Sequence, residues 1–143
     1  MAQKLLLDEL GGIDFIPTLV GKILPHLNTH PIVLLKGNLG TGKTSFSKAL
    51  LKELGYVSEV SSPTFNIVNT YIFEGKTVYH FDLYRIKRVE ELEEIGFMDY
   101  LDSKHVCLIE WPEIVEDFID LPHINMQLEH ADGARHYKVN LID

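Results

Sequence analysis

The sequence predicts an α/β fold in which helices flank a mixed β-sheet, and three observations support this prediction. Residues 32–36 form an apolar strand pattern that runs directly into a glycine-rich loop and then into a helical pattern. Residues 106–109 form another continuous apolar run, as expected of a parallel strand buried on both faces. Two pairs of β-rich segments, each joined by a turn signal, predict antiparallel hairpins. Parallel strands combined with hairpins make the sheet mixed.

The first part of the chain is expected to contain a short strand and then a helix. Residues 4–7 form the strand pattern, and Gly11 and Gly12 end it. Apolar residues then recur at helical spacing, and this stripe would pack against the sheet. Asp14 is a candidate N-cap of this helix, and Pro25 near its end can stop it early. The apolar stripe consists of Ile16, Leu19, Val20, Ile23, Leu24 and Leu27.

The strand, loop and helix of residues 32–54 follow, and the helix is expected to end around Gly55. Residues 57–60 are a candidate for a short strand. Residues 89–95 predict a short helix, and residues 97–101 predict a further helical turn.

Four β-rich segments are predicted to form the two hairpins. Residues 65–73 and 77–83 are separated by a glycine-containing turn signal and are expected to pair with each other. Residues 124–128 and 137–141 alternate between apolar and polar side chains and are also separated by a turn signal. The chain is therefore expected to end in a hairpin.

Length and charge limit the classes of function. The 143 residues suit one domain covering residues 1–143, without repeats or linkers. The net charge is −8, with 21 acidic residues against 13 basic ones. Strong binding to nucleic acids depends on Lys and Arg side chains that neutralise phosphates, so independent binding to a nucleic acid is not expected. If the protein acts on a nucleic acid, a partner is expected to hold it.

The single cysteine and the hydropathy pattern bear on location. One cysteine, Cys107, excludes an intramolecular disulfide, and its apolar neighbours predict a packed thiol. No apolar run approaches the ~20 residues that span a bilayer. We therefore expect no membrane association and a cytoplasmic location.

The loop at residues 37–44 carries the clearest chemical signal. Its sequence, GNLGTGKT, matches G-x-x-x-x-G-K-[ST] between a strand and a helix, which makes an accidental glycine-rich turn a poor explanation. Glycines let backbone N–H groups converge on a polyphosphate, and the helix dipole adds positive charge beneath it. Lys43 would reach the β- and γ-phosphates, and the Thr44 hydroxyl would bind Mg²⁺. The sequence thus predicts a nucleoside triphosphate site whose candidate contacts are Asn38, Leu39, Gly40, Thr41, Gly42, Lys43, Thr44 and Ser45.

Two carboxylates are candidates for the metal end of this site. Glu110 stands at the carboxyl end of the apolar strand, where it can hold Mg²⁺ through a water, polarise the attacking water, or simply face solvent. Asp82 is either a second metal-associated carboxylate or a solvent-facing residue of an alternating strand. His80 shares a strand face with Asp82, but with no further His or Cys nearby zinc is not expected. Trp111 either stacks over the site or covers the core.

The segment of residues 61–65 is the third candidate constellation. Nucleotide switches place a segment here that is ordered by the γ-phosphate and Mg²⁺, and Thr64 can supply a hydroxyl or a backbone group to it. An ordinary hydroxyl-containing turn before a strand explains the same residues.

Four motifs together resemble one known family. In chain order they are the loop at 37–44, Ser62-Pro63-Thr64-Phe65, the HFDLYR sequence at 80–85 and the IEWPE sequence at 109–113. Over roughly residues 5–141 the chain resembles the bacterial tRNA threonylcarbamoyladenosine biosynthesis ATPase family, TsaE (YjeE). The last three motifs are unusual among P-loop proteins, so the resemblance is specific.

The resemblance implies an ATP- and Mg²⁺-dependent ATPase that assists a TsaB–TsaD complex. That complex transfers a threonylcarbamoyl group to the adenosine beside the anticodon of tRNA, and the resemblance implies that ATP hydrolysis resets it. Lys43, Asp82 and Glu110 would then be the catalytic residues, with Thr44, Asp82 and Glu110 near the metal and Thr64 in a switch-like segment. The tRNA would be carried mainly by the partner, which fits the acidic charge.

Slow turnover that the partner stimulates is expected, because the loop holds no arginine to stabilise the transferred phosphoryl group. Arg85 or an arginine of the partner can supply this charge. A small-molecule kinase is the first alternative, although the chain has only three arginines and no visible lid segment. A nucleotide-bound regulatory subunit without essential catalysis is the second. A GTPase is less expected, because no N-K-x-D motif occurs.

Overall fold

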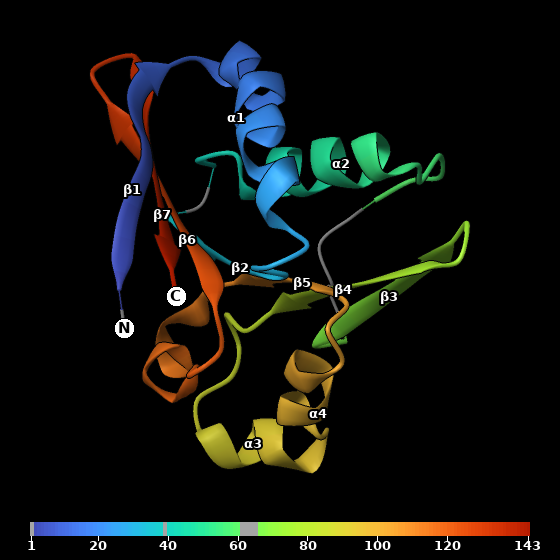
Figure 1. Ribbon diagram of the computed structural model, residues 1–143. Coiled ribbons are helices and arrows are strands. Elements are labelled where there is room, and N and C mark those ends of the chain that lie inside the picture. Colours follow the sequence, from blue (N-terminus) through green and yellow to red (C-terminus); the bar gives the residue numbers. More distant parts are fainter. Residues whose placement is uncertain (1, 39, 61–65) are drawn as a thin grey trace.

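Seven strands form one sheet within residues 2–38, 40–60 and 66–143, which are the residues that the computed structural model describes (Figure 1). The strands are β1 (Gln3–Gly11), β2 (Ile32–Lys36), β3 (Val68–Phe73), β4 (Lys76–Asp82), β5 (Val106–Glu110), β6 (His123–Ala131) and β7 (Ala134–Ile142). Their order in the sheet is β1-β7-β6-β2-β5-β4-β3. β2 pairs in parallel with β5 and β6, and β4 with β5, whereas the other pairs are antiparallel. The predicted mixed sheet is confirmed.

Helices cover both faces of this sheet. The helices are α1 (Ile16–Ile23), α2 (Lys43–Leu54), α3 (Val89–Glu94) and α4 (Phe97–Asp102). Figure 1 shows α1 and α2 on one face and α3 and α4 on the other. Alternate residues of β2 accordingly enter different cores, with Val33 and Leu35 on the side of α1 and α2, and Ile32 and Leu34 on the side of α3 and α4. In the described part of the chain no helix has the length and apolar character needed to span a bilayer.

The first strand is longer than the predicted residues 4–7. β1 pairs with β7 along its whole length, from Gln3 opposite Ile142 to Gly11 opposite Arg135. Backbone hydrogen bonds to a neighbouring strand extend it through polar residues, which give no apolar signal in the sequence. The hairpin of β6 and β7 is confirmed and is longer than predicted for the same reason.

Asp14 is not the N-cap of α1, and that prediction is wrong. Asp14 lies within a 3-10 turn, Ile13–Phe15, that precedes the helix. The N-cap of α1 is the next residue, Phe15, which makes no side-chain hydrogen bond to the helix. Pro17 stands in the first helical turn, where its missing N–H leaves no hydrogen bond unmade. The early stop at Pro25 is confirmed, because α1 ends at Ile23 and a 3-10 turn contains the proline.

Residues 57–60 do not form a strand, so this prediction is also wrong. Gly55 ends α2 in the left-handed conformation, with its N–H bonded to carbonyls of the last turn. Val57, which carries the β signal, is 96% exposed. The β preference of valine comes from packing on a half-buried sheet surface, and here no such surface faces it.

The remaining predicted elements are confirmed with small changes of boundary. The helices expected at 89–95 and 97–101 are α3 and α4. The first hairpin is formed by β3 and β4, which are antiparallel. Its first strand begins at Val68 rather than at residue 65, which lies outside the described residues.

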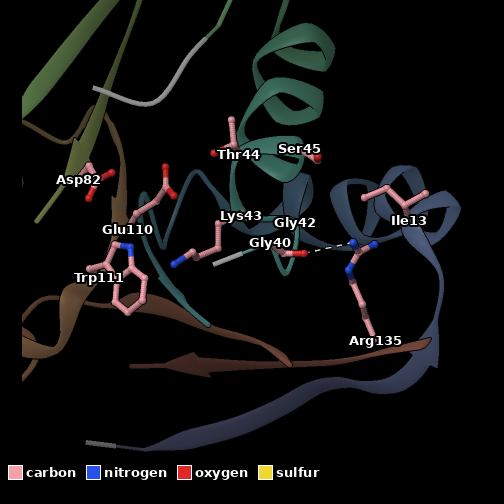
Figure 2. A pocket seen from close by; sticks show the side chains of 10 residues that line it. All are labelled: Ile13, Gly40, Gly42, Lys43, Thr44, Ser45, Asp82, Glu110, Trp111 and Arg135. Carbon is pink, nitrogen blue, oxygen red and sulfur yellow. Dashed lines mark hydrogen bonds between the residues drawn. The ribbon is translucent and has the colours of Figure 1, made fainter. Parts of the chain in front are cut away.

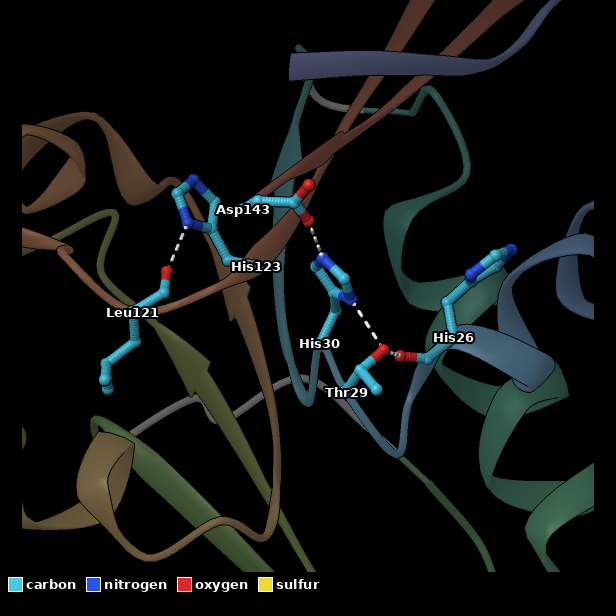
Figure 3. Close-up of polar contacts among 6 residues, drawn as sticks. All are labelled: His26, Thr29, His30, Leu121, His123 and Asp143. Atoms are coloured by element: carbon cyan, nitrogen blue, oxygen red, sulfur yellow. Dashed lines mark hydrogen bonds and ion pairs between the residues drawn. The ribbon is translucent and has the colours of Figure 1, made fainter. Parts of the chain in front are cut away.

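Polar contacts tie the chain together at the amino ends of β2 and β6 (Figure 3). His30 Nε2 lies 2.7 Å from an oxygen of Asp143, and His30 Nδ1 lies 2.8 Å from Thr29 Oγ1. His123 Nδ1 donates to the carbonyl of Leu121 at 2.9 Å. These contacts stabilise the end of the sheet where the parallel strands begin, away from the carboxyl ends of those strands.

Cys107 is expected to be unreactive in the folded protein. Its side chain is fully buried, and burial raises the pKa of the thiol to about 12. Because the thiolate is the reactive form, a disulfide reagent at about pH 8 should modify the native chain slowly and the urea-unfolded chain rapidly. Rapid modification of the folded chain would show that this strand is not buried.

Candidate functional site

The connection between β2 and α2 has the geometry of a phosphate-binding loop. β2 ends at Lys36 and α2 begins at Lys43. Gly37, Gly40 and Gly42 have φ angles of 152°, 78° and 110°, in the region that favours glycine. Gly42 is also the N-cap of α2, so the free N–H groups of the first helical turn face the loop.

Gly37 is the loop position with the least room for a side chain. A Cβ atom there would lie 2.4 Å from the carbonyl oxygen of Leu128 and 2.7 Å from Thr41 Oγ1. The backbone must therefore shift, and we expect Gly37→Ala to lower the free energy of unfolding by about 2–4 kcal/mol. Urea denaturation measures this change.

Gly40→Ala is the matched control for this measurement. Gly40 also has a positive φ, but a Cβ atom there would meet nothing within 4 Å. The control should therefore lose only about 1–2 kcal/mol, the cost of the left-handed conformation. Equal losses in both variants would contradict the close contact at Gly37.

A pocket of about 370 Å³ opens at the carboxyl ends of β4 and β5, beside the loop (Figure 2). Its size is within the range of small-molecule sites. Seven of the predicted site residues line it, namely Gly40, Gly42, Lys43, Thr44, Ser45, Asp82 and Glu110. Three residues that are not among the predicted contacts and catalytic residues complete the lining, namely Ile13, Trp111 and Arg135.

Of the predicted site residues that the structure describes, two do not line this pocket, Asn38 and Thr41. Asn38 lines a neighbouring pocket together with Gly37 and Trp111. Thr41 is buried, and its hydroxyl donates to the carbonyl of Asn38 at 2.8 Å, so it stabilises the loop. Leu39 and Thr64, with the whole segment 61–65, lie outside the described residues.

Lys43 is held inside the loop by two contacts. Its Nζ donates to the carbonyl of Gly37 at 2.6 Å and lies 3.6 Å from the centre of the Trp111 ring. Burial lowers the pKa of Lys43, and the charges of Glu110, Asp82 and Glu113 partly offset this. The ammonium group is thus poorly solvated, which favours an anion beside it.

Glu110 is oriented by a buried histidine. Its side chain is only 4% exposed, and its Oε2 lies 2.6 Å from Nε2 of the fully buried His80. Within the described residues, Nδ1 of His80 is buried without a hydrogen-bond partner. Because a carboxylate oxygen accepts, His80 Nε2–H donates this hydrogen bond to Glu110.

Asp82 lies directly beside Glu110, because the two residues are opposite each other in the parallel pair β4–β5. Burial raises the pKa of Asp82; the Glu110 carboxylate raises it further, and the backbone N–H of Tyr84, at 3.0 Å from Oδ1, lowers it. Two adjacent carboxylates and the Thr44 hydroxyl are hard oxygen donors, which suit Mg²⁺. In the described part of the chain no three His, Cys, Asp or Glu side chains cluster as a metal site, so such a cation would also need oxygens of the nucleotide.

Trp111 has a strained backbone that places its ring at the pocket. Its φ of 57° is uncommon for a bulky residue, and it directly follows the last residue of β5. The indole lies next to the Tyr84 ring, with 4.9 Å between the ring centres, as well as over Lys43. The ring therefore stacks over the site.

Arg135 approaches the loop from the other side of the pocket. It belongs to β7, and its Nη2 donates to the carbonyl of Gly40 at 3.3 Å. Arg85, the arginine that the sequence analysis considered, is exposed and is not among the described residues that line the pocket. The partner of Arg135 is 95 residues away in the sequence, so no local pattern indicates the contact.

Known proteins are similar to this chain in sequence and in fold. The family described as "Threonylcarbamoyl adenosine biosynthesis protein TsaE" matches residues 15–138. A "tRNA threonylcarbamoyladenosine biosynthesis protein TsaE" from Haemophilus influenzae is 38% identical over 120 residues, which are 82% of this chain and 76% of that protein. The protein of the same name from Rickettsia conorii is 43% identical over 110 residues, which are 76% of this chain but only 62% of that protein.

A solved structure supports the fold independently. The crystal structure of YdiB from Bacillus subtilis aligns with a TM-score of 0.77 over 100% of this chain and 89% of that chain. At 22% sequence identity this likeness shows the shared fold.

Proposed function

The chain belongs to the TsaE family of ATP-binding P-loop proteins that take part in threonylcarbamoyladenosine biosynthesis on tRNA, and from this premise we propose that it is a Mg²⁺-dependent ATPase acting with a TsaB–TsaD-type complex. The observation that carries the proposal is one pocket in which the loop lysine, Lys43, and the carboxylates of Asp82 and Glu110 lie together. This combination pairs a cation for the phosphates with oxygen ligands for a metal.

The loop and the first turn of α2 would bind the triphosphate. Backbone N–H groups of the loop and of the first turn of α2 would donate to an anion at the helix N-terminus. Lys43 Nζ would leave the carbonyl of Gly37 and the face of Trp111 and bind the β- and γ-phosphates instead. The hydroxyl of Thr44 would bind Mg²⁺. Leu39 and Thr64 remain proposed contacts from outside the described residues.

The two carboxylates would serve the metal and the attacking water. Mg²⁺ would supply charge neutralisation for the phosphates when bound. His80 holds Glu110 at 2.6 Å and so fixes the direction of its carboxylate. Glu110 would polarise the attacking water or hold a water on the metal, and Asp82 beside it would share the metal. Arg135 lines the pocket and is the chain's own candidate for stabilising charge on the transferred phosphoryl group.

The net negative charge supports the proposal that a partner, rather than this chain, binds the tRNA. With a net charge of −8, the chain is poorly suited to hold tRNA itself, so the TsaB–TsaD-type complex would carry the tRNA. ATP binding would favour assembly, and hydrolysis would reset the complex for another round.

Co-purification with TsaB–TsaD tests this function. We expect the complex to retain the chain in the presence of ATP and Mg²⁺ and to release it without them. Single-turnover ATP hydrolysis should also be faster with the complex than without it. The proposal would be contradicted if the complex retained the chain equally with and without ATP. It would also be contradicted if phosphate were transferred to a small molecule instead of being released as free phosphate.

A further inference from the structure

An apolar groove lies on the face of the molecule that α3 and α4 cover, away from α1 and α2 (Figure 1). Its volume is about 260 Å³. Leu92 and Phe97 form the floor, and Met98 and Phe118 stand at its edge with 45% and 55% of their surface exposed. Exposed Met and Phe side chains that line a groove are typical of surfaces that bind another protein.

Acidic residues dominate the chain around this groove. The elements that contribute to its lining, α3, α4 and the 3-10 turn Glu116–Phe118, contain eight acidic residues and no Lys or Arg. Several of these acids are exposed. Glu93 lines the groove, and Asp117 directly precedes Phe118, which also lines it. Lys87 and Arg88 immediately precede α3, and their backbone N–H groups donate to Glu91.

We propose that this groove binds an amphipathic helix of a partner protein, with apolar side chains in the groove and Lys or Arg residues flanking them. Helices that lie in grooves present apolar residues at i, i+3, i+4 and i+7. The exposed acids of these elements, which include Glu93 and Asp117 and are here called the acidic rim, favour basic flanks and disfavour other occupants. A second copy would bring its own acidic rim against this one, and a nucleic acid or an anionic membrane would be repelled.

A synthetic peptide tests the inference directly. The probe is a fluorescein-labelled amphipathic helix of about 18 residues with a leucine stripe and lysine flanks, and its counterpart carries glutamate in place of lysine. By fluorescence anisotropy, we expect the chain to bind the lysine peptide at least about tenfold more tightly than the glutamate peptide. Phe118→Ser should weaken this binding about tenfold, because an aromatic anchor is lost.

The matched control is Ile72→Ser, which removes another exposed apolar side chain, on β3 at the far edge of the sheet. This variant should bind the lysine peptide like the unmodified chain. Both side chains are more than half exposed, so neither substitution should unfold the protein. Failure of the lysine peptide to bind, or equal binding by Phe118→Ser, would overturn the inference.

A second copy as the occupant has a separate signature. If sedimentation detects a dimer that Phe118→Ser dissociates, the groove is a self-association surface and the inference is wrong. The inference does not rest on the proposed ATPase function, because peptide binding can be measured whether or not the chain hydrolyses ATP.

Discussion

Replacing Glu110 with glutamine is expected to lower the rate of ATP hydrolysis by about 10²-fold or more while ATP still binds. The glutamine has the same shape, and its carbonyl can still accept the hydrogen bond from His80 that now fixes the carboxylate at 2.6 Å. What is lost is the negative charge beside Asp82, which we propose acts on the metal or on the attacking water. Single-turnover hydrolysis measures the rate, and calorimetry measures the affinity for ATP.

Glu113→Gln is the control for this variant. Glu113 is exposed, and it also acts on Lys43 through its charge, but it does not line the pocket of Lys43 and Glu110. Removing its charge should change hydrolysis by less than about threefold, as is usual for an exposed charge. If Glu110→Gln hydrolyses ATP as fast as the unmodified chain, Glu110 has no role in catalysis, and the alternative of a nucleotide-bound subunit without catalysis is favoured.

Replacing Lys43 with methionine is expected to weaken ATP binding by about 10–100-fold, because a charged hydrogen bond to phosphate contributes roughly 1.5–3 kcal/mol. Hydrolysis should fall further, since in the proposed mechanism the same charge stabilises the phosphoryl group in transfer. The fold should persist, because the substitution removes a buried ammonium whose pKa burial has already lowered. Calorimetric titration with ATP and Mg²⁺ measures the loss of affinity.

Lys48→Met separates the role of Lys43 from a general effect of charge. Lys48 lies on the same helix, α2, but is exposed to solvent. Its removal should leave ATP affinity within about twofold, because exposed charges interact weakly through water. Equal losses in both variants would show that Lys43 makes no specific phosphate contact.

Apolar runs and turn signals in the sequence predicted the main strands and their hairpins. The apolar runs at β2 and β5 gave the parallel centre, and the turn signals gave both hairpins. The strand 57–60 failed because valine's β preference depends on a packed neighbour, and Val57 has none. Asp14 failed because the chain makes a 3-10 turn before α1 begins.

The arrangement of the candidate site was only partly predictable. The loop motif identified Lys43 and Thr44 because their neighbours in sequence are also their neighbours in space. The contact between His80 and Glu110 depends on the register of β4 against β5, across 30 residues of chain. Arg135 reaches the loop through the register of the C-terminal hairpin. Such register-dependent contacts leave no local signal.

Calorimetric titration of the folded chain with ATP and Mg²⁺ tests the central claim most directly. The claim is that the backbone N–H groups of residues 37–44 and the Lys43 ammonium bind a triphosphate at the N-terminus of α2. We predict heat of binding at a single site, weakened in Lys43→Met and retained in Lys48→Met. No heat with either ATP or GTP in the presence of Mg²⁺, from protein that unfolds cooperatively, would contradict the account.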